Sequence, residues 1–484
     1  MPHRCTSTCK YFKKDECNPP RCKYINGSQR QYCRLSHKYK MEKPSCNITR
    51  RLKKGEEKPN AEKKIRRFIA QSGIMIKIMC SNSGQCIAFG RKNAEINNFF
   101  KGFTGFDYVV GPVKSLGQPS NNGFVKEITY ERNGYKSYAI LKSSMRPSAD
   151  NLVYEYLVGI KYINRIIRQY PCFIETYGLF YYNDPAHWRR MQGTFPIYNT
   201  ILQQLTLQNT IDYSKSCVEP QQATILIQHI SGAKTLYEFL SNPMYIDTIQ
   251  YDVVFALFII YHALSSISKT FTHYDLHDGN VILYEPSPGK YIQYEYHMAN
   301  NKTISFKCPY LPKIIDYGRS FFDNGNINSK KIYERVCREP DCGDCGDIMG
   351  YSWLTPDSHV FVRSSQKNES HDLRLLHIVK NAFNIINSSV HPTTLAFKRL
   401  FSVIKKVKFG IGIRDPDEKQ FGTKENLRMD TPFIYNVTAA YNSIRDLCEI
   451  PALLVENETR YSNPANRLGT LHIYDDGQSM VYEP

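Results

Sequence analysis

At the centre of this chain stands His273-Tyr-Asp-Leu-His-Asp-Gly-Asn280, which is followed after a long gap by Ile314-Ile-Asp-Tyr-Gly318. In the first stretch an aspartate, Asp275, precedes Asn280 by five residues. That spacing lets the carboxylate face a hydroxyl group while the amide oxygen of Asn280 holds a metal ion, and Asp316 can supply the same metal with a carboxylate. Together the two stretches predict a phosphoryl-transfer site.

Upstream of this site the sequence predicts an antiparallel sheet. Residues 124–130 and 135–141 are short runs of β-branched and aromatic side chains, and Asn133-Gly134 lies between them. An Asn-Gly pair is a strong hairpin signal because both positions of the tight turn take positive φ. Two further strands are expected at residues 172–180 and 223–228, and the polar segment at about 181–222 is expected to be an insertion.

Helical periodicity dominates the rest of the chain. Residues 151–167 place apolar side chains at helical intervals, and Asp150 or Ser148 could cap the first turn. Residues 251–267 are apolar on nearly every side, which is typical of a buried core helix. Strands early and helices late predict an α+β protein with an antiparallel β small lobe and a mainly helical large lobe.

These features resemble the protein kinase superfamily over roughly residues 105–400. Asp275 matches the catalytic-loop aspartate of that family, His273 its structural histidine and Asn280 its metal-binding asparagine. Asp316 matches the metal-binding aspartate of the family's Asp-Phe-Gly motif, with Tyr317 in place of Phe. The resemblance implies a protein-kinase-like two-lobed α+β fold that binds ATP, with Mg²⁺ held by Asn280 and Asp316.

The family's phosphate-binding lysine also has a counterpart. Ala139-Ile-Leu-Lys142 resembles Val-Ala-Ile-Lys, so Lys142 is expected to reach the α- and β-phosphates, and an exposed strand-end lysine is the alternative. Glu155 is the only acidic residue inside the helical stretch that follows, and the resemblance implies that it forms an ion pair with Lys142. The resemblance thus makes Asp275, Lys142 and Glu155 the expected catalytic residues.

The glycine-rich loop is the poorest match to the family. Leu116-Gly-Gln-Pro-Ser-Asn-Asn-Gly-Phe-Val125 keeps a first and a last glycine and the following valine, but it lacks the middle glycine. Backbone amides there could still cover phosphate groups, and a plain β-turn is the alternative. The resemblance implies nucleotide contacts from eight residues: Leu116, Gly117, Gly123, Val125, Ala139, Lys142, Asn280 and Asp316.

The residues around Asp275 leave the acceptor open. The leading hypothesis is a serine/threonine protein kinase that acts on protein hydroxyls, with Asp275 accepting the hydroxyl proton. His277 stands where such kinases usually carry lysine, and Asp-Leu-His-x-Gly-Asn resembles the aminoglycoside and choline-type phosphotransferases, so a small-molecule acceptor is the second hypothesis. A catalytically weak pseudokinase scaffold is the third hypothesis, and the degraded glycine loop favours it.

Two further residues are expected to shape the site. Tyr274 replaces the arginine of His-Arg-Asp, which removes the cation that pairs with a phosphorylated activation loop, so we expect activity without such phosphorylation. Asp372 lies in a stretch that resembles the start of the large-lobe central helix, where it is expected to brace the catalytic loop.

Charge divides the 484-residue chain unevenly. Residues 1–67 carry 20 Lys or Arg and 6 Asp or Glu, a net charge of +14, so the remainder carries +4 of the total of +18. Such a segment could contact nucleic acid, an acidic partner or an anionic membrane, and a solvated tail is the alternative. We expect a Cys-rich basic head at 1–46, a basic linker and lead-in at 47–102, the kinase small lobe at 103–230, and the kinase large lobe with a C-terminal extension at 231–484.

Cysteine usage and hydropathy bear on metals and location. Six head cysteines could bind Zn²⁺, form a disulfide knot or stay as thiols: Cys5, Cys9, Cys17, Cys22, Cys33 and Cys46. A second candidate zinc site combines Cys308 with Cys337, Cys342 and Cys345.

No apolar run is long enough for a transmembrane segment. The combination of kinase core, insertions and Cys-rich head resembles serine/threonine-protein kinases of large (giant) DNA viruses, which implies the host cytoplasm, with packaging in a virion as a further expectation.

Overall fold

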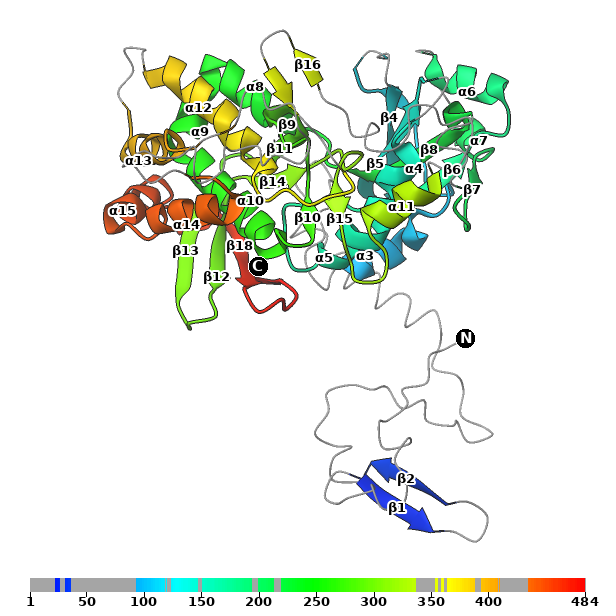
Figure 1. Cartoon of the computed structure of the whole chain (residues 1–484), viewed down its shortest axis with the longest axis horizontal. Coiled ribbons are helices and arrows are strands. Elements are labelled where there is room, and N and C mark those ends of the chain that lie inside the picture. The colour runs from blue at the N-terminus through cyan, green and yellow to red at the C-terminus, as the bar shows by residue number, and fades with distance from the viewer. Residues whose placement is uncertain are drawn as a thin grey trace. The chain divides into compact units, whose positions relative to one another are not determined.

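The computed structural model of this chain describes residues 22–26, 31–35, 93–117, 119, 123–146, 150–193, 199–212, 219–336, 353–355, 358–360, 364–387, 393–407, 409 and 434–483. The chain divides into two compact units, Met1–Arg67 and Phe68–Pro484 (Figure 1). In the first unit, the described residues form one antiparallel hairpin of β1 (Cys22–Asn26) and β2 (Gln31–Leu35). The side chains of the six head cysteines lie outside the described part of the chain.

The small lobe of the second unit is built on a six-stranded sheet with antiparallel pairings, in the order β3-β4-β5-β8-β6-β7. The strands are β3 (Lys114–Ser115), β4 (Gly123–Arg132), β5 (Tyr135–Ser144), β6 (Thr176–Tyr181), β7 (Thr206–Leu207) and β8 (Ala223–His229). The predicted hairpin is confirmed, because β4 and β5 are joined at Asn133 (φ 52°) and Gly134 (φ 80°).

One face of this sheet is covered by residues that precede it in the chain. Phe99, at the end of α3 (Asn93–Phe99), and Phe103 pack with Tyr130 of β4 and Leu141 of β5 in one buried cluster. Residues 93–102, which we expected to be lead-in, therefore contribute to the core of the small lobe. The expected insertion at 181–222 contains α6 (Pro185–Gln192), α7 (Asn199–Leu202) and β7, and it adds Met191 and Leu202 to the same cluster.

The strand expected at 172–180 begins later, at Thr176. The cause is a second partner, because Cys172 O accepts a hydrogen bond of 2.7 Å from Ile314 N and Phe173 forms a parallel bridge with Ile314. Residues 172–174 are thus held by the strand that leads into Asp316, and only the segment after them joins the small-lobe sheet.

The helix expected at 151–167 is present with an internal π turn. It consists of α4 (Leu152–Val158), the π turn Gly159–Ile163 and α5 (Asn164–Ile166). Oδ1 of Asp150 accepts a hydrogen bond of 2.6 Å from Leu152 N at the start of α4, whereas the N-cap residue itself, Asn151, makes no side-chain cap bond. A Cβ on Gly159 would lie 2.0 Å from Oγ1 of Thr176, so glycine is required where this helix approaches β6.

The large lobe is mainly helical. Its helices include α8 (Leu236–Ser241), α9 (Ile246–Tyr251), α10 (Val253–Ile267), α11 (Ser329–Val336), α12 (Arg374–Asn387), α13 (Leu395–Ile404), α14 (Val437–Leu447) and α15 (Pro451–Arg460). The helix expected at 251–267 begins instead at Val253, because the chain bends by 59° between α9 and α10. Among the described residues no single helix is long and apolar enough to cross a membrane, whereas the bent pair Pro243–Tyr251 and Val253–Ile267 meets that length and composition test together.

Short strands complete the large lobe and carry the central motifs. One sheet has the order β14-β11-β9, formed by β14 (Leu311–Ile314), β11 (Val281–Tyr284) and β9 (Lys234–Thr235), and β10 (Phe271–Thr272) pairs with β15 (Phe321–Phe322). Because β11 pairs with β14, the residues just before β11 and just after β14 lie side by side.

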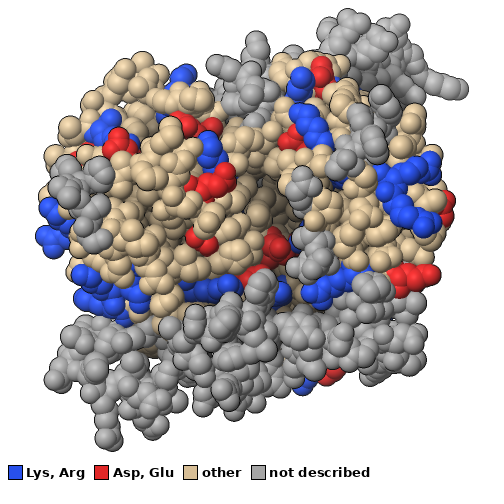
Figure 2. Space-filling model, turned by 90° about the horizontal axis from the view of Figure 1, so that it is seen from above, with Lys and Arg blue, Asp and Glu red and all other residues tan. Residues whose placement is uncertain are grey.

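A second sheet of the large lobe has the order β13-β12-β18-β19. Its strands are β12 (Tyr291–His297), β13 (Thr303–Cys308), β18 (Arg467–Tyr474) and β19 (Val481–Glu483). Strands β18 and β19 form an antiparallel hairpin near the C-terminal end of the described residues. An antiparallel small lobe beside a helical large lobe is compatible with a protein-kinase-like fold. Figure 2 shows that the surface between the lobes is hollowed and that acidic side chains are visible in the hollow.

Candidate phosphoryl-transfer site

Lys142 contacts one carboxylate of its own lobe and one of the large lobe. Its Nζ lies 2.7 Å from Oε2 of Glu155 on α4 and 3.0 Å from Oδ1 of Asp316 in the large lobe. The expected ion pair with Glu155 is therefore present in the structure. The alternative of an exposed strand-end lysine does not apply, because the Lys142 side chain is 27% exposed and both partners are within contact distance.

Burial and charge together set the ionisation of this triad. Burial lowers the pKa of Lys142, but the carboxylates of Asp316 and Glu155 outweigh that effect and hold the pKa above its ordinary value. Burial also acts to raise the pKa of Asp316, and Lys142 overrides it, so that pKa is lowered. The pKa of Glu155 is raised to about 7 by burial, which the attraction of Lys142 offsets only in part. The arrangement keeps a cation beside the ionised carboxylate of Asp316.

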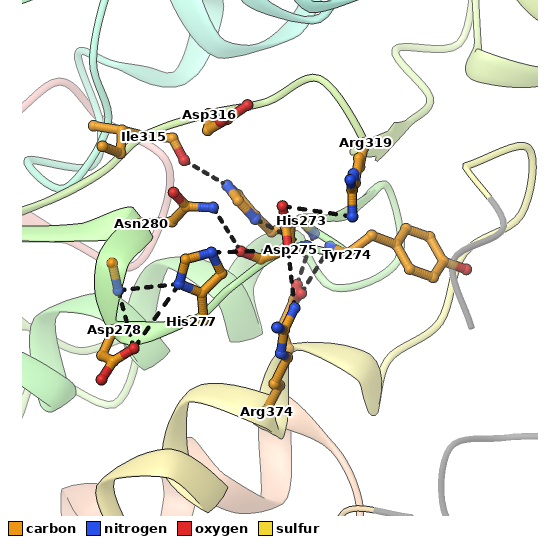
Figure 3. A network of polar contacts seen from close by, with 12 residues as sticks. His273, Tyr274, Asp275, His277, Asp278, Asn280, Ile315, Asp316, Arg319 and Arg374 are labelled. Carbon is orange, nitrogen blue, oxygen red and sulfur yellow. Dashed lines mark hydrogen bonds and ion pairs between the residues drawn. The ribbon is translucent and has the colours of Figure 1, made fainter. Parts of the chain in front are cut away.

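Asp275 lies at the centre of the predicted catalytic loop, residues 273–280, between β10 and β11, and Figure 3 shows the contacts around it. Its Oδ1 accepts a hydrogen bond of 2.8 Å from Nη1 of Arg374, at the start of α12. Its Oδ2 lies 3.8 Å from Nη1 of Arg319, and its Oδ1 lies 3.9 Å from Nε2 of His277. The carboxylate is only 11% exposed, so these three groups determine its direction.

Neither arginine was anticipated from the sequence. Arg374 follows Asp372 by two residues at the start of α12, and Arg319 directly follows the Asp-Tyr-Gly motif. Burial lowers the pKa of Arg319, and the nearby carboxylate of Asp275 opposes that shift. The sequence signal that could have found them is their position immediately after two recognised motifs. What it could not show is that both guanidinium groups turn towards Asp275.

Asp372 fixes the backbone of the catalytic loop. Its two carboxylate oxygens accept hydrogen bonds from His273 N at 2.8 Å and from Tyr274 N at 3.0 Å, so it contacts the loop in the way the sequence predicts. Burial raises the pKa of Asp372 to about 7. Tyr274 has φ 64°, a left-handed conformation that costs a non-glycine residue energy, and the bonds to Asp372 help to hold it.

His273 links the catalytic loop to the Asp-Tyr-Gly segment. Its Nε2 lies 2.9 Å from Ile315 O, and its Nδ1 lies 3.3 Å from Asp275 N. A carbonyl can only accept and a backbone amide can only donate, so the ring has a proton on Nε2 and a lone pair on Nδ1. Burial lowers the pKa of His273 to about 4, which agrees with a neutral ring. His273 thus has a structural position that fixes the backbone before Asp316.

Asn280 and Asp316 form a donor set suited to magnesium. Ile315 N donates a hydrogen bond of 3.0 Å to Asn280 O, so Asn280 lies beside the residue that directly precedes Asp316. Nδ2 of Asn280 donates to Asp275 O at 2.9 Å, so the amide oxygen is directed away from that carbonyl. A carboxylate and an amide oxygen are hard oxygen donors, the chemistry that Mg²⁺ prefers. The residues present therefore fit the expected metal.

Two tyrosines replace the residues that the family motifs usually carry. The hydroxyl of Tyr317 lies 2.9 Å from Ile174 N, from which it accepts, and 2.8 Å from Ile314 O, to which it donates. The hydroxyl of Tyr274 donates to Gln366 O at 2.8 Å, in the segment that follows β17 (Ser358–Val360). Each hydroxyl therefore holds a backbone segment by hydrogen bonds. A phenylalanine at position 317 could not form them, because its ring carries no hydroxyl.

The nucleotide contacts expected from the small lobe divide between the two faces of the sheet. Val125 and Lys142 are cross-strand partners, so both side chains lie on the same face of the sheet. Ala139 is fully buried in the cluster of Phe103 and Leu141 on the other face, so the expectation of a nucleotide contact there was wrong. Side chains alternate along a strand, and Ile140 therefore shares the face of Lys142.

The glycine-rich segment is a β3–β4 connection with two different glycine requirements. Leu116 N donates to Val125 O at 3.0 Å and closes the hairpin. Gly117 has φ 68°, which favours glycine for conformational reasons. A Cβ on Gly123 would lie 2.5 Å from Ser143 O, so this glycine allows close approach of β5. The tip of the connection includes residues outside the described ranges.

The candidate zinc site in the large lobe is not supported by Cys308. This residue is completely buried, and its side chain belongs to the main core cluster with Phe306 and Tyr294. Burial raises the pKa of the Cys308 thiol far above its ordinary value, which disfavours the thiolate that binds zinc. Cys337, Cys342 and Cys345 lie outside the described residues.

Comparison with known proteins gives a structural likeness but no family. No family model matches the chain, and no curated protein matches it. Among solved structures it is similar to WaaP in complex with acyl carrier protein, at 9% sequence identity, over 77% of this chain and 98% of that chain, with a TM-score of 0.28. A likeness at that TM-score supports no conclusion about activity, which rests instead on the contacts of this chain's own residues.

Proposed function

We propose that this chain is an ATP- and Mg²⁺-dependent serine/threonine protein kinase. The observation that carries the proposal is the contact of Lys142 with both Glu155 and Asp316, beside a loop in which Asn280 bonds to the backbone of Asp275. These five residues come from segments far apart in the sequence, and a phosphoryl-transfer site needs each of their chemical types. The pseudokinase alternative has less support, because none of these polar positions has been lost.

The proposed reaction moves the γ-phosphoryl group of ATP to a hydroxyl group. A bond forms between the acceptor oxygen and the γ-phosphorus, the bond from that phosphorus to the β–γ bridging oxygen breaks, and ADP leaves. Asp275 orients the acceptor hydroxyl and takes its proton, while Lys142 binds the α- and β-phosphate oxygens. Mg²⁺ held by Asp316 and Asn280 would offset the negative charge of the β- and γ-phosphates.

A second candidate function is transfer to a small hydroxylated molecule, and His277 is the observation that favours it. Its Nε2 lies 3.9 Å from Asp275 Oδ1, so an imidazole takes the place of the lysine ammonium that protein kinases for Ser and Thr have there. However, Arg374 and Arg319 bring positive charge to Asp275 by another route. These arginines supply cations near Asp275 although position 277 has no lysine. We therefore keep a protein acceptor as the leading proposal.

Transfer of labelled γ-phosphate separates the candidates. The full chain would be incubated with γ-labelled ATP, Mg²⁺ and either a mixture of basic proteins or a panel of aminoglycosides, choline and sugars, beside an Asp275→Asn variant. We expect label on protein serine or threonine with the wild type and a loss of about 100-fold or more with the variant. Label on a metabolite alone would establish the second candidate. Label on neither set, with ATP still bound, would contradict both and favour a scaffold.

A further inference from the structure

A second cluster of chemically versatile side chains lies on the sheet β13-β12-β18-β19. Side chains alternate along its strands, and one face buries residues such as Tyr294 and Tyr296 against α10. The other face carries Glu295 and His297 of β12 with His472 of β18, and all three are partly exposed. Because β12 and β18 are parallel, with Glu295 paired to His472, residues far apart in sequence meet there.

The three side chains point their donor atoms at one another. Nε2 of His297 lies 3.0 Å from Nδ1 of His472, and Nδ1 of His472 lies 3.2 Å from Oε2 of Glu295. One ligand atom from each residue falls within 4.8 Å of the other two. Two ligands of a tetrahedral zinc ion bound at 2.0–2.1 Å are about 3.3 Å apart, so the two closest spacings are near those of a bound ion.

Hydrogen bonding alone cannot satisfy both close contacts of His472 Nδ1. Nδ1 of His472 faces both an imidazole nitrogen and a carboxylate oxygen, and a single proton on Nδ1 can be given to only one of them. A cation placed among His297, His472 and Glu295 would receive a lone pair from each. Neutral imidazole and carboxylate are the donors that Zn²⁺ accepts, and two histidines with one glutamate leave a fourth position for water.

The second nitrogen of each imidazole faces an oxygen atom. Nδ1 of His297 lies at hydrogen-bond distance, 3.4 Å, from Oγ1 of Thr303 on β13. Nε2 of His472 lies 3.5 Å from Oε2 of Glu483 on β19, an ion-pair separation at which this structure has no hydrogen bond. Histidine ligands usually donate their second N–H to an oxygen, which fixes the tautomer and makes the other nitrogen a better donor. The nitrogens next to Thr303 and Glu483 would carry the protons, and the nitrogens that face each other would then be free to bind metal.

We propose that His297, His472 and Glu295 form a Zn²⁺ site on this sheet. The ion would link β12 to β18, two strands separated by about 170 residues of chain, and so attach the C-terminal β18–β19 hairpin to the large lobe. This site shares no residue with the phosphoryl-transfer site, and it stands whether or not the chain is a kinase.

Zinc titration of the full chain tests the proposal. Metal-free protein would be titrated with Zn²⁺ by calorimetry, comparing wild type with His297→Ala, His472→Ala and Glu295→Gln. We expect each variant to lose one equivalent of zinc relative to wild type. The matched control is Gln293→Ala, because Gln293 lies on the same strand and the same face and donates to Ser305 Oγ at 2.6 Å. The control should keep the full stoichiometry, and zinc should raise its melting temperature as it does in wild type.

Two further measurements distinguish this site from zinc bound by cysteines elsewhere in the chain. Co²⁺ spectra of wild type and His472→Ala would be subtracted, and we expect a difference spectrum without thiolate charge-transfer bands. Glu483→Gln, which leaves all three ligands in place, should weaken zinc binding by about 10- to 100-fold without unfolding the sheet. Equal zinc stoichiometry and affinity in wild type, His297→Ala and Glu483→Gln would overturn the proposal, as would thiolate bands in the difference spectrum.

Discussion

The carboxylate of Asp275 is held by guanidinium groups from two different segments. Arg374 contacts it at 2.8 Å and Arg319 approaches it at 3.8 Å, while His277 stands 3.9 Å away. In a site where the acceptor hydroxyl must meet this carboxylate, the direction of the side chain matters as much as its charge. Arg374 is therefore a positioning residue for Asp275 in the proposed reaction.

Replacing Arg374 tests this role. Arg374→Ala should lower kcat by about 10- to 100-fold with little change in KM for ATP, because Arg374 contacts Asp275 at the acceptor side of the site. Arg374→Lys should recover part of the loss, since it restores the charge but not the planar geometry. Arg445→Ala is the control, because Arg445 pairs at the surface with Asp446. A larger change in KM for ATP than in kcat would contradict the role.

Asp372 should give the stability of the large lobe a distinctive pH dependence. Burial raises the pKa of its carboxyl from 3.8 to about 7, so between these values the unfolded chain loses a proton that the folded chain keeps. The free energy of unfolding must therefore fall as pH rises through this window. Asp372→Asn cannot titrate there, so from pH 5 to pH 7 the wild type should lose stability relative to the variant. Denaturant unfolding at each pH measures the difference, and a constant difference would show that Asp372 does not titrate in this range.

Strands and helices add requirements that single residues do not reveal. In β4 and β5, Gly123 faces Ser144 across the ladder, and a Cβ on Gly123 would meet Ser143 O at 2.5 Å. A Cβ atom essentially never lies that close to a carbonyl oxygen, so the strands would have to separate. This glycine is part of the expected glycine-rich loop, yet the structure gives it a packing role in the sheet that holds Lys142.

Gly123→Ala should therefore destabilise the small lobe. We expect the free energy of unfolding to fall by about 1–3 kcal/mol, the usual cost of forcing an extra carbon into a packed site. Gly105→Ala provides the control, because a Cβ there meets no atom within 4 Å and its φ is not positive. Both values come from urea titration of the full chain. Similar losses in the two variants would mean that β5 can move away at little cost.

The elements that the sequence predicts well are those with local signals. The hairpin of β4 and β5 follows from Asn133-Gly134, and the helix after β5 follows from its apolar spacing. The bend between Tyr251 and Val253 was missed because the residues on both sides of Asp252 are helical and no proline or glycine marks the break. The error at Ala139 was avoidable, since alternation along a strand already separates it from Lys142 by three positions and puts it on the opposite face.

At the scale of the whole molecule, the site depends on contacts between the two lobes. Lys142 of the small-lobe sheet contacts Asp316, and Ile314 N bonds to Cys172 O just before β6. The sequence identified Lys142, Asp275, Asn280 and Asp316 because motif residues keep fixed spacings within a segment. It could not supply Arg374 or Arg319, because their approach to Asp275 depends on how separate segments fold against each other.

ATP turnover by the purified full chain tests the central claim most directly. Mg²⁺-dependent conversion of ATP to ADP in the presence of an acceptor would be measured for wild type, Asp275→Asn and Lys142→Met. Lys136→Met is the matched control, because Lys136 lies on the same strand with a side chain that is 44% exposed, 3.7 Å from Glu131. We predict turnover by wild type and by the control, and a loss of about 100-fold or more in the other two variants. Equal turnover in all four proteins, or none in wild type with any acceptor, would contradict the proposed phosphotransferase.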